Sequence, residues 1–133
     1  MVVCLDSDFI IDLLRGKPFA VDFFNKCKDS EDLITTEVSK FEIFSGIYLK
    51  KVLNEDEKSV ASGFFDSLST LPFDDSCGEI AAKIFASLSK SGNIIGQADM
   101  FIGAIMKKNE CNKIITRNVK DYSRIDGIEV ISY

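Results

Sequence analysis

The stretch VVCLDSDFIIDLL, residues 2–14, places a short apolar run directly before an aspartate and an apolar pattern at helical spacing. The run is typical of a short buried strand, because its apolar residues follow one another without alternation. Ser7 is in a position to cap the helix that follows, and Gly16 can end that helix at the position after its last turn. The stretch therefore predicts a strand joined to a helix by a tight polar turn that contains Asp6.

The rest of the chain repeats this alternation. Further strands are predicted at residues 32–36, 112–116 and 128–132, with a brief extended piece at 71–73. Further helices are predicted from Pro18 to about Cys27, from Glu37 to about Lys51, from the cap Asn54 to about Leu68, from Asp74 or Asp75 as cap to Gly92, and from Gln97 to Lys108, with a turn or short helix at 118–122. Short strands that alternate with helices predict a three-layer α/β/α domain with a mainly parallel central sheet, formed by residues 1–133 as one domain.

The composition limits the classes of function. The absence of histidine from 133 residues excludes Ser-His-Asp and Cys-His catalysis and the histidine-based zinc proteases. A net charge of −5 counts against a passive nucleic-acid-binding module. The four cysteines are scattered without the close pairs of zinc sites, and they are typical of small buried residues in a reducing compartment. No apolar run approaches the ~20 residues of a membrane span and no signal peptide is evident, so we expect a cytoplasmic protein with no membrane partner.

Three acids stand in apolar surroundings. Asp6 follows the first apolar run, while Glu42 in KFEIFSGI and Asp99 in GQADMFIGAI each interrupt an apolar helical pattern. An unpaired charge is costly to bury. In parallel sheets the functional crevice lies beyond the carboxyl ends of the strands. Asp6 follows the first strand and Asp121 lies a few residues after NKIIT, so we expect both at that edge.

Each acid also has a purely structural interpretation. Asp6 fits a helix cap, Glu42 fits the edge of an apolar stripe, and Asp99 fits the first turn of a helix, where the macrodipole favours an acid. Together, however, they require three semi-buried acids without a basic partner, which is costly for each ion. A divalent cation would remove that cost, and carboxylates without histidine or cysteine favour Mg²⁺ or Mn²⁺. Clusters of carboxylates that bind such ions are typical of enzymes that hydrolyse phosphodiester bonds.

Four segments resemble, in order and spacing, the four motifs of PIN-domain ribonucleases, and most of all those of the VapC-type toxins of prokaryotic toxin–antitoxin pairs. These segments are LDSDFIIDLL, FEIFSG, IIGQADMFIGAIM and IITRNVKDY. Any one of them is a weak signal, but all four occur in the family's order and span nearly the whole chain. The resemblance implies a single PIN-like domain of residues 1–133.

The resemblance also implies roles for individual residues. The catalytic and metal-binding acids would be Asp6, Glu42, Asp99 and Asp121. Supporting polar side chains would be Ser7, Asp8, Thr116 and Asn118, and phosphate contacts would be Arg117 and Lys120. Asp8 departs from the family pattern, which often has asparagine two residues after the first acid, so this extra carboxylate either contributes to the site or faces away from it. Asn118 stands where other PIN domains can have aspartate, so Asp121 is the acid that the family motif supports least.

The activity implied is metal-dependent cleavage of single-stranded regions of RNA with Mg²⁺ or Mn²⁺. The resemblance further implies a homodimer and a cognate antitoxin that wraps the domain and fills its acidic groove. We expect the antitoxin groove at the helix pair Phe41–Leu49 and Val60–Leu68, because eleven phenylalanines are many to bury in one 133-residue monomer. An arginine or lysine of the antitoxin would pair there with Glu42 or Asp99.

Other functions fit the sequence less well. The residues DSD after an apolar strand also resemble the start of the haloacid dehalogenase phosphatase motif, but residues 9–12 read FIID without its threonine, and no later acid pair follows a suitable strand. A receiver-like phosphorylation domain fits the sequence poorly for similar reasons. Within the PIN family, the alternatives are a non-toxin nuclease of RNA processing and a catalytically inactive PIN-like interaction module. A missing acid would favour the inactive module, and detection of bound Mg²⁺ or Mn²⁺ would argue against it.

Overall fold

The computed structural model describes residues 1–133 and contains five strands and seven helices in the order that the sequence predicts. The strands are β1 (Val2–Leu5), β2 (Asp32–Thr36), β3 (Ser69–Leu71), β4 (Lys113–Ile115) and β5 (Glu129–Ile131). The helices are α1 (Ser7–Leu14), α2 (Pro18–Cys27), α3 (Glu37–Tyr48), α4 (Glu55–Asp66), α5 (Cys77–Lys90), α6 (Gln97–Lys108) and α7 (Val119–Tyr122).

The sheet is parallel throughout, and its spatial order is β3-β2-β1-β4-β5. The central strand is β1, in which Val3 lies opposite Leu33 of β2 on one side and Lys113 of β4 on the other. The chain first extends the sheet from β1 through β2 to β3, and then adds β4 and β5 on the other side of β1. The order therefore reverses between β1 and β4, and such a topological switch point is where open α/β sheets bind ligands.

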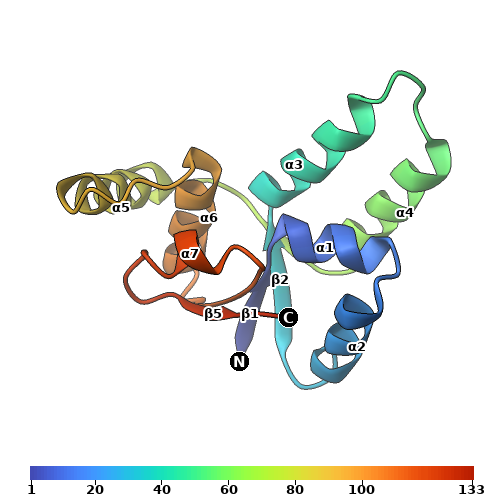
Figure 1. Ribbon diagram of the computed structural model, residues 1–133, viewed down its shortest axis with the longest axis horizontal. Coiled ribbons are helices and arrows are strands. Elements are labelled where there is room, and N and C mark those ends of the chain that lie inside the picture. The colour runs from blue at the N-terminus through green and yellow to red at the C-terminus, as the bar shows by residue number, and fades with distance from the viewer.

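Helices cover both faces of the sheet (Figure 1). On one face, Cys4 of β1 and Ile114 of β4 pack with side chains of α5 and α6. On the other face, Val3 and Leu5 of β1 pack with side chains of α1, α2, α3 and α4. Because successive residues of a strand point to opposite faces, the uninterrupted apolar run of β1 is buried on both sides. The three-layer α/β/α architecture with a parallel central sheet is thereby confirmed.

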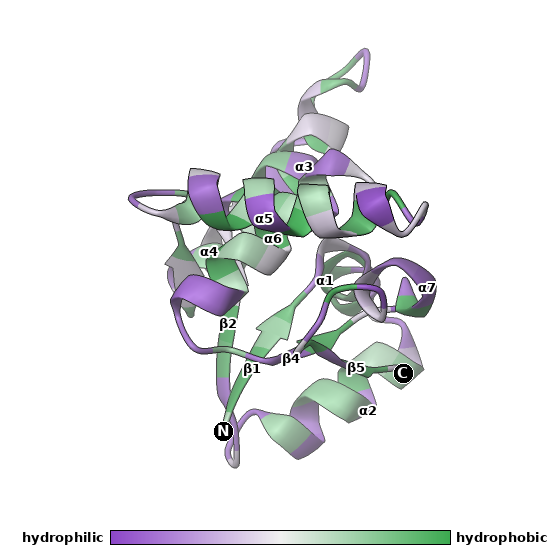
Figure 2. Ribbon diagram, turned by 90° about the vertical axis from the view of Figure 1, so that its left-hand side faces the viewer, coloured by the Kyte–Doolittle hydropathy of each residue, from purple (hydrophilic) through white to green (hydrophobic).

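The helices differ in how much of their surface is buried. Figure 2 shows apolar residues along β1 and β2, whereas α5 carries both hydrophilic and hydrophobic residues. Helix α5 buries one stripe at helical spacing, as a surface helix does: Cys77, Ala81, Ile84 and Leu88. Helix α6 instead buries Met100 and the continuous run from Ile102 to Met106. The helix that carries Asp99 is therefore enclosed on most sides, as its sequence predicts.

Local signals set most helix ends. Asn54 caps α4, and its side chain accepts a hydrogen bond from the Glu57 amide at 3.1 Å. Gly16 and Gly92 follow α1 and α5 with φ of 71° and 72°, in the left-handed region that glycine adopts most easily. At the start of α1, the cap is Asp6 rather than the predicted Ser7, because the Asp6 carboxylate accepts a hydrogen bond from the amide of the next residue.

Three other predictions of element bounds need correction. The predicted cap of α5 by Asp74 or Asp75 is wrong, because Ser76 precedes that helix with φ of 73° and no side chain caps it. The Asp74 carboxylate is held instead by Lys108 at the end of α6, at 2.6 Å. The extended piece predicted at 71–73 is a strand two residues earlier, β3, and α3 ends at Tyr48 rather than near Lys51.

The helices and the cysteines bear on two further expectations from the sequence, one about membrane spans and one about the state of the thiols. None of the helices has the length and apolar character needed to cross a membrane. All four cysteines are free thiols, and three of them, Cys4, Cys77 and Cys111, are buried as the sequence predicts, whereas Cys27 is only partly buried.

Candidate functional site

The acids singled out in the sequence meet at the carboxyl-terminal edge of the sheet, at the switch point between β1 and β4. Asp6 directly follows β1. Glu42 reaches this edge from α3 and Asp99 from α6, which pack mainly on opposite faces of the sheet. Asp121 lies on the short helix α7 after β4. Hydrogen bonds connect these residues into one network, so segments from most of the chain converge on one place.

Asp6 lies at the centre of the network. The residue is only 5% exposed. Its Oδ1 accepts a hydrogen bond from the Ser7 amide at 2.8 Å, and its Oδ2 accepts one from Thr116 Oγ1 at 2.7 Å. Burial raises the pKa of Asp6 to about 7, an effect that the Thr116 hydrogen bond opposes and the charge of Asp8 increases. Asp6 is therefore a helix cap, but one whose charge is costly at neutral pH.

Glu42 joins the site through Ser7. The Ser7 hydroxyl donates a hydrogen bond to Glu42 Oε1 at 3.2 Å, which ties the first turn of α1 to the middle of α3. Glu42 is partly buried, and burial raises its pKa, while the charges of Asp99 and Asp8 add to the rise. This acid therefore faces the other acids rather than standing at an outer edge of its helix.

Asn118 joins the remaining two acids. Its side-chain amide Nδ2 lies 3.1 Å from Asp99 Oδ2 and 3.3 Å from Asp121 Oδ2. Burial raises the pKa of Asp99, a hydrogen bond from Tyr122 lowers it, and the charge of Asp121 raises it. Asn118 therefore contributes a neutral donor that holds two neighbouring carboxylates.

The loop between β4 and α7 is held by Asp8. Thr116 is fully buried, and its hydroxyl lies 3.3 Å from Asp8 Oδ2 as well as close to Asp6. The Arg117 amide donates to Asp8 Oδ2 at 2.9 Å, and the Asn118 amide donates to Thr116 Oγ1 at 3.0 Å. Asp8 thus contacts the backbone and side chains of the loop, so the aspartate that departs from the family pattern points into the network rather than away from it.

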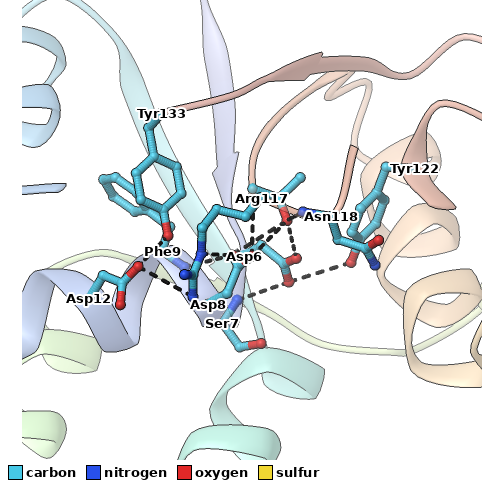
Figure 3. Close-up of polar contacts among 10 residues, drawn as sticks. Asp6, Ser7, Asp8, Phe9, Asp12, Arg117, Asn118, Tyr122 and Tyr133 are labelled. Atoms are coloured by element: carbon cyan, nitrogen blue, oxygen red, sulfur yellow. Dashed lines mark hydrogen bonds and ion pairs between the residues drawn. The ribbon is translucent and has the colours of Figure 1, made fainter. Parts of the chain in front are cut away.

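The two basic residues proposed as phosphate contacts lie at the rim. Figure 3 shows the Arg117 side chain extended toward α1, where its Nη2 lies 3.4 Å from Asp12 Oδ2 and its Nε lies 3.9 Å from Asp8 Oδ2. Its side chain remains 60% exposed. Lys120 is exposed and forms no ion pair. Arg117 is therefore already partnered by two carboxylates, whereas Lys120 is free.

Tyr122 is a residue of the site that the sequence analysis missed. It is fully buried, and its hydroxyl lies 3.0 Å from Asp99 Oδ1 and 3.4 Å from Asp6 Oδ1. Burial and the charges of the two acids raise its pKa far above the usual range, so the hydroxyl keeps its proton and donates. A buried tyrosine needs a partner for its hydroxyl. That rule, applied to a tyrosine next to Asp121, is the signal that could have found it.

The charge of the four acids is not balanced by the protein. No lysine, arginine or amino terminus forms an ion pair with any of them. The ligands that they offer are carboxylate oxygens, which suit a hard divalent cation such as Mg²⁺ or Mn²⁺. As the side chains stand, no group of three or more acids or cysteines is close enough together to hold a metal ion. The edge therefore has the ligand chemistry of a metal site without a closed set of ligands.

Comparison with known proteins identifies a family for the chain. The family model described as the PIN domain matches residues 3–128. The chain belongs to the PIN-domain family. No match is found among curated proteins.

Solved structures that contain VapBC proteins share the fold. VapBC2 from Rickettsia felis, bound to a DNA fragment of its promoter, superposes with a TM-score of 0.89 at 17% identity, covering 100% of this chain and 99% of that one. DNA-bound VapBC from Salmonella typhimurium gives 0.86 at 22% identity, covering 99% and 98%. VapBC-5 from Mycobacterium tuberculosis, a member of the VapBC family of toxin–antitoxin systems, gives 0.66 at 19% identity, covering 99% and 98%. At these identities the likeness establishes the fold, and the function has to be argued from the site.

Proposed function

We propose that this PIN domain, residues 1–133 acting as a single unit, is a metal-dependent endoribonuclease that cleaves single-stranded regions of RNA. The observation that carries the proposal is the convergence of Asp6, Glu42, Asp99 and Asp121 at the switch point without any cationic partner. Such a cluster costs stability unless a cation or protons neutralise it. Membership of the PIN family adds support from a separate direction.

In this proposal the four acids hold Mg²⁺ or Mn²⁺. The ion would lower the pKa of an attacking water and stabilise the charge of the leaving oxygen. The protein's polar side chains orient the ligands: Thr116 holds Asp6, Ser7 holds Glu42, and Asn118 holds Asp99 and Asp121. Asp8 supports the loop that carries Thr116 and Asn118.

Phosphate groups of the RNA would be contacted at the rim of the site. Lys120 is exposed and unpaired, so it can bind a phosphate without breaking an existing interaction. Arg117 would have to give up part of its pairing with Asp8 and Asp12 to do the same. We therefore assign Lys120 as the more available phosphate contact.

We further propose that the chain is the toxin of a type II toxin–antitoxin pair, acting as a homodimer in the cytoplasm. A groove of about 490 Å³ runs between α1, α3 and α4 and is lined by Ile11, Leu14, Ile43, Ile47, Val60 and Ala61, with Glu42 at its wall. This is the helix pair that the sequence predicts for the antitoxin. An apolar antitoxin segment in the groove could extend a basic side chain to Glu42, and VapBC structures of the same fold contain such pairs of proteins.

Incubation of the purified protein with single-stranded RNA tests the nuclease proposal. Cleavage should occur with Mg²⁺ or Mn²⁺ and stop with EDTA. We expect Asp99→Asn to stay folded but to retain only a small fraction of the wild-type activity. Asp22→Asn, which changes an exposed aspartate of α2 whose side chain forms no hydrogen bond or ion pair, is the matched control and should cleave normally. Undiminished cleavage by a folded Asp99→Asn protein would refute the assignment.

A further inference from the structure

Tyr122 joins two acids that come from different parts of the fold. Its hydroxyl lies 3.0 Å from Asp99 Oδ1, on α6, and 3.4 Å from Asp6 Oδ1, at the end of β1. No other side chain in the structure hydrogen-bonds to both of these acids. The hydroxyl has one proton, which it donates mainly to the nearer Asp99 Oδ1 and shares with Asp6 Oδ1, so this one group contacts both the strand side and the helix side of the acidic cluster.

The position of this hydroxyl is fixed by the core. The Tyr122 ring is fully buried and belongs to the same hydrophobic cluster as Met106 of α6 and Ile125. Its place on α7 is set by the loop before it, since the Tyr122 amide donates to the Asn118 carbonyl at 3.4 Å. A close-packed interior leaves such a ring little freedom to move. The two carboxylates must therefore adjust to the hydroxyl, rather than the hydroxyl to them.

The other oxygen of each carboxylate accepts a hydrogen bond from a different residue. Thr116 donates to Asp6 Oδ2 at 2.7 Å, and Asn118 donates to Asp99 Oδ2 at 3.1 Å. A carboxylate with a donor at each oxygen cannot rotate without losing a hydrogen bond. Each oxygen has more than one lone pair, so lone pairs remain for a cation.

We infer that Tyr122 is a positioning residue that cross-links Asp6 and Asp99 and fixes how their carboxylates are presented to a divalent cation. The inference rests on the proposed function and adds a residue to it. A neutral donor orients the two acids without cancelling their charge, whereas a lysine or arginine in the same place would compete with the cation. Partners of this kind behind metal ligands strongly affect metal affinity.

A second tyrosine in the chain provides a matched control. Tyr133 donates to Asp12 Oδ2 at 2.7 Å, and its ring packs edge-on against Phe9 at 4.8 Å between centroids. In Figure 3, Tyr133 with Asp12 and Tyr122 lie on opposite sides of the site. Both tyrosines thus make the same kind of hydrogen bond, but only Tyr122 makes it to proposed metal ligands.

Titration with Mn²⁺, followed by electron paramagnetic resonance of the free ion, tests the inference on the purified full chain. Tyr122→Phe keeps the ring and removes the hydroxyl, and it should weaken Mn²⁺ binding by about 10–100-fold. Tyr133→Phe should bind Mn²⁺ like the wild type. Equal affinity of Tyr122→Phe and wild type, or an equal loss in both variants, would overturn the positioning role and leave the proposed function intact. Absence of Mn²⁺ binding by the wild type would overturn the proposed function itself.

A second measurement covers the case in which Tyr122→Phe does not fold. The chain has three tyrosines, so uniform labelling with 3-fluorotyrosine gives three ¹⁹F resonances in the otherwise unchanged protein. Addition of Mg²⁺ should shift the Tyr122 resonance with the midpoint of metal binding and leave those of Tyr48 and Tyr133 in place. A Tyr122 resonance that does not respond while Mg²⁺ binds would overturn the inference.

Discussion

The Thr116 hydroxyl donates a 2.7 Å hydrogen bond to Asp6 Oδ2, and both groups are buried where β4 and β1 end side by side. This contact crosses the point at which the strand order reverses. It stabilises the charged form of Asp6 and so lowers a pKa that burial raises. Asp6 and Thr116 belong to different sequence motifs, so the site is formed where their two strands end side by side and not by either motif alone.

Replacement of Thr116 by valine should separate the role of its hydroxyl from that of its volume. Loss of the donor leaves a buried carboxylate oxygen unsatisfied, which costs about 1–3 kcal/mol of unfolding free energy at a pH where Asp6 is charged. Metal affinity should fall as well, because the partner that orients Asp6 is gone. Urea unfolding and Mn²⁺ titration measure the two effects.

The control for this variant is Thr35→Val. Thr35 is also fully buried and donates to the Leu5 carbonyl at 2.9 Å, outside the acidic network. This variant should lose stability but keep its Mn²⁺ affinity. If Thr116→Val bound Mn²⁺ as tightly as the control, Thr116 would be a structural residue only.

The raised pKa of Asp6 predicts that the metal-free protein loses stability as the pH rises. An unfolded aspartate titrates near 3.8, whereas Asp6 in the fold titrates at about 7, so the folded state binds the extra proton between these values. The contribution of protonated Asp6 is complete below the unfolded pKa and is lost as the pH passes through the folded pKa. Glu42 and Asp99, whose pKa values are also raised, act in the same direction.

Urea unfolding without metal, at about pH 5 and about pH 8, measures this dependence. The midpoint should be lower at the higher pH. Asp6→Asn imitates the protonated side chain and retains a good helix cap, so it should flatten the dependence. A midpoint that rises with pH in the wild type would contradict the pKa that burial gives Asp6.

Mg²⁺ or Mn²⁺ should restore the stability that the clustered acids remove. A cation that binds only the folded state at about 100 times its dissociation constant adds about 2.7 kcal/mol to the free energy of unfolding. In thermal melts near neutral pH, the wild type and Asp22→Asn should therefore gain several degrees with metal. Asp99→Asn should melt at the same or a higher temperature without metal and gain nothing with it. Large destabilisation of the metal-free protein by both Asp6→Asn and Asp99→Asn would identify these acids as ordinary structural residues.

The sequence predicts those features of the fold that depend on neighbouring residues, and it misses those that depend on contacts between residues far apart in the chain. The termination of α1 just before Gly16, the cap Asn54 and the enclosed helix α6 depend on nearby residues, and the sequence predicts all three. The start of α5 is missed because Asp74 is bound by Lys108, which lies 34 residues away. Strand β3 is misplaced because three residues carry too little pattern, and pairing with β2 selects them.

The site shows the same division. The acids Asp6 and Asp99 stand out in the sequence because a charge among apolar residues is anomalous wherever the chain folds. Tyr122 does not stand out, because an aromatic residue in a core is ordinary until its hydroxyl is seen between two carboxylates. The pairing of Arg117 with Asp12 likewise depends on a contact between α1 and the loop after β4. A charge in apolar surroundings is therefore predictable from the sequence, and the family resemblance adds Ser7, Thr116 and Asn118, whereas Tyr122 is found only in the structure.

The antitoxin proposal makes a prediction about two valines on the α3–α4 side of the molecule. Val60 lines the groove and is 55% exposed, whereas Val52 is 82% exposed and lies outside it. A charge in the groove would have to be buried by an apolar partner segment, so Val60→Asp should prevent formation of the complex, and Val52→Asp should not. Neither change touches the acidic cluster, so both variants should cleave RNA.

Co-expression with the adjacent small open reading frame, followed by affinity purification and growth assays, measures binding and protection. Val60→Asp should be toxic even with the partner present, and Val52→Asp should be neutralised like the wild type. A wild-type chain that binds no partner and is harmless when expressed alone would exclude the toxin role, and a nuclease of RNA processing would then describe it better.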